Sequence, residues 1–226
     1  MRCLSRLSAL RPPCLERYRG SSKAWDDIDL SCKKELRAAL VQMQEVSSPE
    51  GEDRLFCAYC EGRIYGGASH IDHFRPKARD KFPQLTFAWE NLFLSCEAGD
   101  HCGHFKDKKG RPSYCSEDLL KPDEDDPDHY LYFHSTGEVR VREGVSEADA
   151  QRGAETIKVF GLNCPQLRVA RRKAIGFYRE RFLGDLEELE SWSEADIREY
   201  VDHEILLAAA EPYATGVKQF LRTLSS

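Results

Sequence analysis

Several residues that bind metals or move protons in proteins lie in one stretch of the chain, between positions 57 and 104. Four of them are cysteines in two pairs, Cys57 with Cys60 and Cys96 with Cys102. Two pairs suit a closed tetrahedral zinc site and are a far stronger signal than a single Cys-x-x-Cys. The second pair is spaced more widely by residues 97–101, so His101 could replace one cysteine. We predict a structural Zn²⁺ on these thiolates, with unliganded structural thiols as the less favoured alternative.

A second set of polar residues is interleaved with the cysteines: Asp72, His73, Asn91 and His104. Phosphodiester hydrolysis needs a base that deprotonates water and a cation that stabilises the leaving oxygen. His73 suits the base because an imidazole titrates near neutrality. Asp72 and His104 suit a divalent ion such as Mg²⁺ or Mn²⁺, and Asn91 suits the orientation of the His73 loop or ring. The alternative is a group of surface residues beside a structural zinc, but all four in this order favour a catalytic site.

The remaining histidines carry weaker signals. His70 either faces the same cleft or packs against its neighbours, and its spacing leaves both possibilities open. His129, His134 and His203 lie outside the pattern, and we expect them to be structural.

The distribution of charge points to the same stretch. The net charge is −6, so the chain as a whole is not a basic nucleic-acid wrapper. Basic residues nevertheless flank the suspected site on both sides: Arg75, Lys77, Arg79 and Lys81 follow His73, and Lys106, Lys108, Lys109 and Arg111 follow His104. Basic residues in these positions could bind the phosphate backbone of a nucleic acid. The alternative interpretation is that they are ordinary solvated surface residues. We predict nucleic-acid contacts at Arg75, Lys77, Lys106 and Lys108. Residues 117–128 and 187–204 are acidic.

The elements that position these residues follow from hydrophobic periodicity and turn signals. Residues 25–45 have helical spacing, with Asp26 or Asp27 as the cap. Residues 70–74 alternate like a strand and place Asp72 and His73 on opposite faces. Residues 56–64 are typical of a zinc knuckle followed by a short strand. Residues 87–93 predict a short helix that carries Asn91, and residues 96–110 predict an irregular loop in which His104 opens a helical turn.

The second half of the chain is mainly helical. Residues 112–127 predict an acidic linker, and residues 130–142 a hairpin. Helices are expected from Ser146 to residue 160, from Pro165 to about residue 190, over 193–210 with Ser193 as cap, and over 217–224. The second helix gathers four arginines on one arc: Arg168, Arg171, Arg172 and Arg179. This basic face either contacts nucleic acid or an acidic partner, or consists of arginine stems around a buried stripe.

The chain contains no apolar run of the kind that a signal peptide or a membrane span needs, which predicts a cytoplasmic protein with no membrane partner. Thiols stay reduced in that compartment. We therefore expect five cysteines to be ordinary unpaired thiols: Cys3, Cys14, Cys32, Cys115 and Cys164.

The motifs described above resemble those of the HNH endonucleases, which have a ββα-metal fold. The runs His70-Ile-Asp-His-Phe-Arg-Pro-Lys77 and Trp89-Glu-Asn-Leu-Phe-Leu-Ser-Cys96 are most similar to the HNH subunits of Septu-type and retron-associated anti-phage systems. The resemblance implies His73 as the base, Asn91 as the orienting residue, a catalytic ion at Asp72 and His104, and zinc at the cysteines. It also implies an ATPase partner of the ABC/SMC type. Gly103 between Cys102 and His104 departs from the family pattern.

Together these inferences predict an α+β protein with a zinc-stabilised ββα-metal core, an N-terminal helical arm and a mainly helical C-terminal extension. The expected parts are residues 1–50, 51–112 and 113–226, with the last as a docking region for a partner. The expected function is metal-dependent hydrolysis of DNA in anti-phage defence. A non-catalytic zinc-stabilised binding module and an RNA nuclease are the alternatives, and DNA over RNA rests on the resemblance alone.

Overall fold

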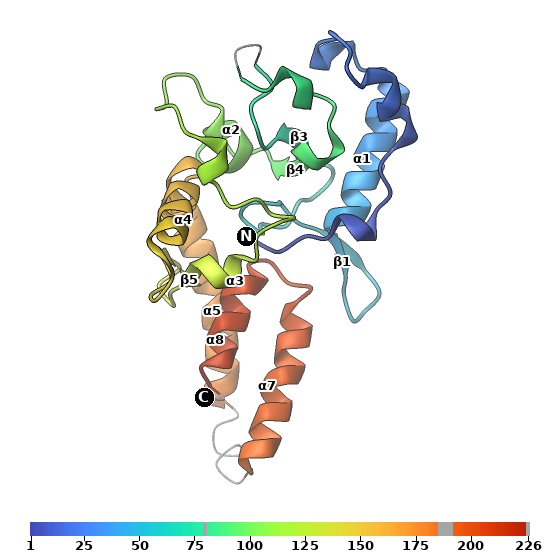
Figure 1. Cartoon of the computed structure of the whole chain (residues 1–226). Helices are drawn as coiled ribbons and strands as arrows, with labels where there is room; N and C mark the ends of the chain where they lie inside the picture. Colours follow the sequence, from blue (N-terminus) through green and yellow to red (C-terminus); the bar gives the residue numbers. More distant parts are fainter. Residues whose placement is uncertain (79–80, 185–191, 225–226) are drawn as a thin grey trace.

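The computed structural model describes residues 1–78, 81–184 and 192–224 (Figure 1). Arg79, the predicted helix end near residue 190 and the start of the acidic stretch 187–204 lie outside these ranges. The helices are α1 Leu30–Gln44, α2 Cys102–Lys106, α3 Pro127–Tyr130, α4 Glu147–Val159, α5 Pro165–Gly184, α7 Glu194–Ala208 and α8 Ala214–Arg222. The strands are β1 Glu45–Ser47, β2 Asp53–Leu55, β3 Ser69–His73, β4 Leu92–Cys96, β5 Leu131–Phe133 and β6 Val139–Val141. They pair as three two-stranded antiparallel sheets: β1 with β2, β3 with β4, and β5 with β6.

The β3–β4 sheet carries most of the predicted site residues. Its register pairs Asp72 with Phe93 and His73 with Leu92. Because side chains alternate along a strand, His70 and Asp72 share one face and His73 lies on the other, as expected. The short helix α2 follows β4 and packs against it.

One local prediction around this sheet was wrong, and another was right only in part. Residues 87–93 do not form a helix: a single 3₁₀ turn, Trp89–Asn91, leads directly into β4. The apolar residues of β4 are buried on both faces of the strand. A short continuous run of apolar residues is compatible with either a strand or a helix, so the sequence pattern did not distinguish the two. Residues 96–110 contain the expected helical turn, but this turn, α2, begins at Cys102, so that His104 lies at its centre and does not open it.

The helix α1 connects the sheet to the zinc knuckle through one buried side chain. The Gln44 amide nitrogen donates to the carbonyl oxygens of Phe56 and Leu94, both at 3.0 Å. Its amide oxygen accepts from Leu94 N at 2.7 Å. These bonds fix β4 and the start of the knuckle to the same helix. The helix itself begins at Leu30, with Asp29 as its N-cap residue, because the expected caps Asp26 and Asp27 belong to a separate 3₁₀ turn.

The N-terminal arm is held to α1 by a disulfide between Cys14 and Cys32. The expectation that these two residues are unpaired thiols was therefore wrong. Their separation of 18 residues has no spacing signature, and only the packing of the arm on α1 brings the sulfurs together. Cys3, Cys115 and Cys164 are free, as expected.

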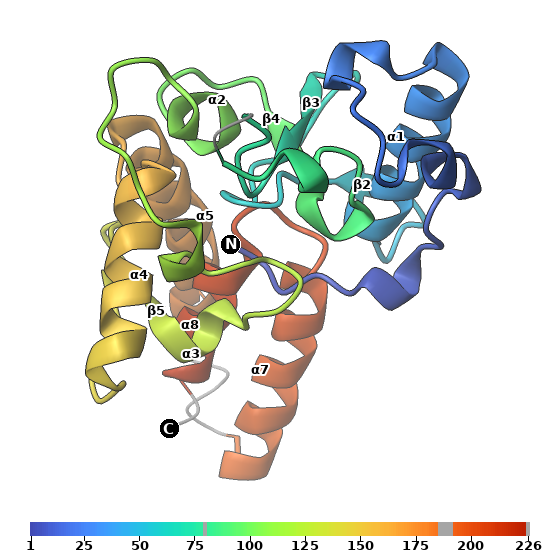
Figure 2. The same ribbon diagram turned by 45° about the horizontal axis from the view of Figure 1, so that its top comes forward.

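In the C-terminal half, the predicted hairpin forms as β5 and β6, and Ser146 and Ser193 cap α4 and α7 as predicted. The last helix begins at Ala214, three residues earlier than expected. The helices α5, α7 and α8 extend away from the β3–β4 region (Figures 1 and 2). They enclose a small apolar cluster of their own, which includes Ile175, Val201 and Val217.

Residues 112–127 were expected to be a linker, but part of this segment packs into the core. Leu119 and Leu120 are buried, and Leu120 N donates to Thr156 Oγ1 of α4 at 2.8 Å. The buried residues of the main cluster come from the arm, from the central stretch and from residues beyond 113. The segment has few apolar residues among many acidic ones, so its sequence did not predict that part of it would be buried.

The predicted basic face of α5 also requires a correction. Arg171 is buried, and its guanidinium donates to the carbonyl oxygens of Gly137, at 2.9 Å, and Leu162, at 2.5 Å. It therefore joins α5 to the β5–β6 turn, whereas Arg168, Arg172 and Arg179 are exposed. Across the described ranges, no helix has both the length and the apolar character needed to cross a membrane.

Candidate metal centres and catalytic cleft

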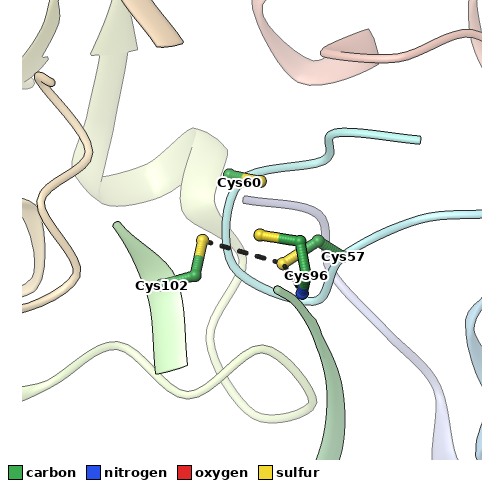
Figure 3. Close-up of side chains that lie close together, drawn as sticks. All are labelled: Cys57, Cys60, Cys96 and Cys102. Atoms are coloured by element: carbon green, nitrogen blue, oxygen red, sulfur yellow. Dashed lines mark hydrogen bonds between the residues drawn. The ribbon is translucent and has the colours of Figure 1, made fainter. Parts of the chain in front are cut away.

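The four predicted zinc ligands converge in the folded chain. The sulfurs of Cys57, Cys60, Cys96 and Cys102 all lie within 4.8 Å of one another and point toward a common centre (Figure 3). Cys57 Sγ and Cys102 Sγ are 3.7 Å apart. A tetrahedral site with Zn–S bonds of about 2.3 Å has sulfur–sulfur edges of about 3.8 Å. The cluster can therefore hold a metal ion such as zinc, and the prediction that these cysteines come together is confirmed.

Backbone hydrogen bonds shape the loop that carries the first pair. Cys57 N donates to Gly62 O at 3.0 Å, and the reversal passes through Glu61, whose φ is +64°. Two thiols also accept backbone hydrogen bonds: Cys60 Sγ from Gly62 N at 3.3 Å and Cys57 Sγ from Cys96 N at 3.4 Å. Donors of this kind stabilise thiolates, which are the form that zinc binds.

The thiols of the cluster influence one another strongly. The hydrogen bond to Cys102 is the largest cause that lowers the pKa of Cys96, whereas burial raises the pKa of Cys102. The cluster therefore favours negative charge on Cys96, and a cation at its centre would replace the shared protons. His101 is not among the four clustered ligands. It forms a side-chain hydrogen bond with Cys96 and also lies close to Asp100 and Cys164.

His73, the predicted base, is fixed at the end of β3. Its Nε2 hydrogen bonds to the carbonyl oxygen of Thr86 at 2.9 Å, and because a carbonyl only accepts, Nε2 carries the proton. The Trp25 ring meets the imidazole edge-on, with the ring centroids 4.6 Å apart. No described residue bonds to Nδ1. Burial, followed by the charges of Lys77 and Lys106, lowers the pKa of His73 to about 3, so the ring is neutral at physiological pH.

Asn91 ties together the two segments that meet at His73. Its Oδ1 accepts from Arg75 N at 2.7 Å, and its Nδ2 donates to Arg75 O at 3.0 Å and Leu85 O at 3.1 Å. Arg75 lies just after His73, and Leu85 lies just before Thr86. Asn91 therefore sets the separation between the His73 ring and its carbonyl partner.

Asp72 takes part in a buried polar network on the other face of β3. Tyr59 Oη donates to Asp72 Oδ2 at 2.5 Å, and Lys106 Nζ lies 3.6 Å from the same oxygen. Lys106 Nζ also donates to His73 O at 2.9 Å and to Asp107 Oδ1 at 2.8 Å. Burial lowers the pKa of Lys106, but the two carboxylates raise it above its ordinary value, so the lysine stays charged.

The expectation that Lys106 contacts nucleic acid does not fit this position, because its side chain is 0 % exposed. The residues that follow it, Asp107, Lys108 and Lys109, are charged and exposed, so the local sequence pattern does not reveal that the Lys106 side chain turns inward to a buried carboxylate.

The structure brings His104 together with His70 and Glu97. Their ligand atoms lie within 4.8 Å of one another. The two imidazoles stack with centroids 3.8 Å apart, and Glu97 Oε2 lies 2.8 Å from His104 Nε2. Asp72, the expected partner of His104, is not part of this group: its Oδ1 lies 3.9 Å from His70 Nε2. Two imidazoles and a carboxylate form a donor set that suits a divalent transition metal.

Gly103 allows this cluster to approach Asp72. A Cβ atom at position 103 would lie 2.7 Å from both Asp72 Oδ1 and His70 Nε2, so the start of α2 leaves no room for a side chain there. The departure from the family pattern at this position thus has a steric reason in this chain.

A cleft of about 480 Å³ opens beside His73. It is lined by both basic flanks, including Lys77, Lys81, Lys108 and Arg111. Lys77, Lys81 and Lys108 are exposed. Arg75 lies outside this lining and faces Glu117, with 3.7 Å between the charged groups. The cleft therefore offers a positive surface next to the buried, neutral imidazole of His73.

Two residues of the His104 cluster were missed or left open by the sequence. Glu97 lies in the insertion between Cys96 and Cys102. A carboxylate between two predicted metal ligands was the sequence feature that could have identified it as a further ligand. His70 occurs two residues before Asp72, so strand alternation alone puts both on one face.

Comparison with known proteins gives two partial similarities, and no family model matches the chain. The chain is 23% identical over 120 residues to a Vibrio cholerae serotype O1 biovar El Tor protein named "Retron Vc95 putative HNH endonuclease". This match covers 53% of the chain and 57% of that protein. The chain is also 32% identical over 77 residues to Septu protein PtuB of Bacillus thuringiensis, which covers 33% of the chain and 27% of PtuB. These partial matches support the resemblance of this chain to HNH-type nucleases of anti-phage defence.

Proposed function

We propose that this chain is a metal-dependent endonuclease of the HNH type that hydrolyses phosphodiester bonds of DNA. The observation that carries the proposal is the setting of His73. Its Nε2 is bonded to Thr86 O, its Nδ1 has no partner among the described residues, and its ring lines a basic cleft. A neutral imidazole held in this way can take a proton from water through Nδ1. The two partial similarities support the same activity.

The other residues at the cleft have positioning roles in this proposal. Asn91 keeps Thr86 O in place for His73 by holding the chain on both sides of the ring. Lys106 Nζ donates a hydrogen bond to the His73 carbonyl oxygen and so fixes the backbone at His73. Lys77 and Lys108 bind phosphate oxygens at the rim, as the charge pattern predicts. Arg75 faces Glu117, so its guanidinium must move away from that carboxylate before it can bind a phosphate of the nucleic acid.

We assign the catalytic ion to His70, Glu97 and His104, with Asp72 beside His70. This set replaces the pair of Asp72 and His104 that the sequence suggested. When bound, the ion stabilises the negative charge on the leaving oxygen. Imidazole ligands suit Mn²⁺ better than Mg²⁺, so Mn²⁺ should support the higher activity. The Cys57 cluster would hold Zn²⁺ as a purely structural ion.

The His73 ring and the His70 ring of the His104 cluster leave β3 on opposite faces, and Lys106 Nζ connects the two sides through His73 O and Asp72 Oδ2. We therefore propose that the isolated chain is a poor nuclease and that a partner aligns the substrate with both groups. By resemblance, that partner is an ATPase of the ABC/SMC type in an anti-phage defence system. The helices beyond residue 113 are the proposed docking region.

A plasmid-nicking assay in Mn²⁺ and in Mg²⁺ tests the activity. We expect His73→Gln to abolish cleavage, since the amide has no basic nitrogen, while folding and zinc content stay unchanged. The matched control is His203→Ala, which removes an exposed histidine far from the cleft in sequence and should leave cleavage intact. A folded His73→Gln protein that nicks at the wild-type rate would contradict the assignment of the base.

The same assay separates the alternatives. Parallel reactions with single-stranded RNA, duplex RNA and plasmid identify an RNA nuclease if only RNA is cut. Binding of nucleic acid without cleavage of any substrate, in either metal and with the partner present, would favour a zinc-stabilised binding module.

A further inference from the structure

We propose a second zinc-type metal site, formed by Asp100, His101 and Cys164, that is separate from both the Cys57 cluster and the proposed catalytic ion. His101 Nδ1 lies 2.7 Å from Asp100 Oδ1 and 3.6 Å from Cys164 Sγ. The carboxylate oxygen, the imidazole nitrogen and the sulfur all lie within 4.8 Å of one another. These atoms belong to segments more than 60 residues apart, as the 63-residue separation of His101 and Cys164 shows.

Each group also has a hydrogen bond of its own, because His101 bonds to Asp100 and Cys96, and Cys164 bonds to the backbone of Leu167 and Gln166. What is particular to this cluster is that two ligand atoms crowd one ring nitrogen. Both Asp100 and Cys164 face the same ring nitrogen of His101. If Nδ1 carries a proton, it donates to the nearer carboxylate, and the Cys164 thiol then has no acceptor in that ring. If Nδ1 is unprotonated, the carboxylate faces a lone pair at 2.7 Å, which is repulsive. A divalent cation between the three atoms satisfies each of them as a donor.

The donor set indicates which ion would bind. One carboxylate, one imidazole and one thiolate combine hard, borderline and soft ligands, a set that suits Zn²⁺ and does not suit Mg²⁺ or Ca²⁺. Three protein ligands leave one tetrahedral position for water. The Asp100 side chain is 45% exposed and the His101 side chain 11%, so solvent reaches the site from the Asp100 side.

Contacts outside the ligands hold the two segments together, so the site is preorganised. Cys102 N donates to Phe160 O at 2.8 Å, and Cys164 N donates to Gly161 O at 3.0 Å. A Cβ atom on Gly161 would lie 3.0 Å from Asp100 O, which shows how closely the backbones approach. A ligand set on such a fixed frame binds its ion with little loss of conformational entropy.

The inserted residues between Cys96 and Cys102 thus have a function in this proposal. Glu97 faces the His104 cluster, whereas Asp100 and His101 face Cys164, and Cys102 turns to the four-cysteine cluster. An ion at Asp100, His101 and Cys164 would join this loop to the start of α5, and so couple the central part of the chain to the C-terminal helices.

Co²⁺ titration of the full-length chain, first loaded with one equivalent of Zn²⁺ to fill the Cys57 cluster, tests the proposal. Thiolate ligands give Co²⁺ a charge-transfer band, to which the His70, Glu97 and His104 site contributes nothing because it has no sulfur. We expect the wild type to bind one Co²⁺ that gives a band of one-thiolate intensity, in addition to any Co²⁺ without such a band at the His70, Glu97 and His104 site. Cys164→Ala should lose this band, and Asp100→Asn should weaken the affinity at least about tenfold.

Two matched controls identify the source of the band. Cys115→Ser removes a free, exposed thiol and His104→Ala removes a ligand of the other proposed site, so both should keep the band. Circular dichroism shows that each variant is folded, and the exposed Asp100 gives a readout even if Cys164→Ala does not fold. The absence of a thiolate band in the wild type, or equal Co²⁺ affinity in wild type and Asp100→Asn, overturns the proposal.

Discussion

At the residue scale, His73 combines two properties that rarely occur together: it is almost fully buried, yet it lines a cleft. The burial and the neighbouring lysines keep it neutral, and the Thr86 carbonyl fixes which nitrogen holds the proton. This environment has a consequence for stability that does not depend on catalysis.

We expect the protein to lose stability as the pH falls below 6.5, because His73 is buried in its neutral form. Its pKa is about 3 in the folded chain, against about 6.5 for an unperturbed histidine. Between these values the unfolded chain binds the extra proton, so the free energy of unfolding rises with pH. The contribution is complete above pH 6.5, and about 2 kcal/mol of it is lost between pH 6.5 and pH 5.

Urea unfolding at pH 7 and pH 5 measures this effect. His73→Gln should lose about 2 kcal/mol less stability than the wild type between the two pH values. His203→Ala, the matched control, should behave like the wild type. Equal pH dependence in wild type and His73→Gln would show that the imidazole is not buried in its neutral form.

Gly103 gives a second prediction at this scale. Gly103→Ala places a methyl group against the Asp72 carboxylate and the His70 ring, so we expect a loss of about 1–3 kcal/mol in stability. Mn²⁺-dependent cleavage should fall as well, because the His70 ring, which stacks on His104, must move. Gly99→Ala is the control, since nothing lies within 4 Å of a Cβ there. Identical denaturation midpoints for the two variants would argue against the close approach.

At the element scale, short secondary structures rely on cross-links. The strands β3 and β4 have five residues each and α2 has five, which is too little to be stable alone. The four-cysteine cluster joins the knuckle to the end of β4 and the start of α2. The Cys14–Cys32 disulfide joins the arm to α1.

We expect Cys57→Ser to lose bound zinc and much of its thermal stability, because the binding energy of a structural zinc is folding energy. Zinc content by mass spectrometry and the melting temperature measure the two effects. Cys3→Ser, which changes an exposed free thiol, is the control. A Cys57→Ser protein with unchanged zinc content and melting temperature would mean that the ligand set is different.

The disulfide should stabilise the native state by about 3 kcal/mol, the value expected for a closed loop of this length. Cys14→Ala should therefore unfold at lower denaturant, and a reducing agent should lower the stability of the wild type but not of this variant. The loop also holds Trp25 against His73, so cleavage should fall together with stability. Two reactive thiols at Cys14 and Cys32 in the native protein would contradict the pairing.

At the scale of the whole molecule, we propose that cleavage needs a partner as well as this chain. The net charge of −6 makes non-specific duplex affinity weak, apart from the basic cleft. His73, the proposed base, and His70 of the proposed ion cluster face opposite sides of β3. Acidic residues of α7, such as Glu194, Glu199 and Asp202, offer an exposed surface for a basic patch on a partner.

We expect the isolated chain to nick plasmid slowly in Mn²⁺ and the product of a neighbouring ATPase gene to accelerate it at least about tenfold, by delivering and aligning DNA. Assays with and without that protein, at low and high salt, measure the effect. Changing Glu194, Glu199 and Asp202 to lysine should remove the acceleration and leave the basal rate unchanged. Full activity of the isolated chain, with no response to the partner, would favour the view that the C-terminal helices only support the core.

The sequence by itself determined the features that depend on neighbouring residues. The two cysteine pairs, the alternation that separates Asp72 from His73, the β5–β6 hairpin and the caps at Ser146 and Ser193 all rest on spacings of a few residues. The resemblance to HNH-type defence nucleases comes from the same local motifs. The catalytic roles of His73 and Asn91 remain predictions, with a geometry that allows them.

Only the tertiary structure decided the features that depend on segments far apart in the chain. Lys106 and Arg171 turn inward because carboxylates and carbonyl oxygens from other segments receive them. Cys14 finds Cys32, and Cys164 reaches His101, through packing that leaves no trace in local spacing. Local sequence sets the conformation of a few residues, whereas burial and pairing depend on how whole elements share the apolar core.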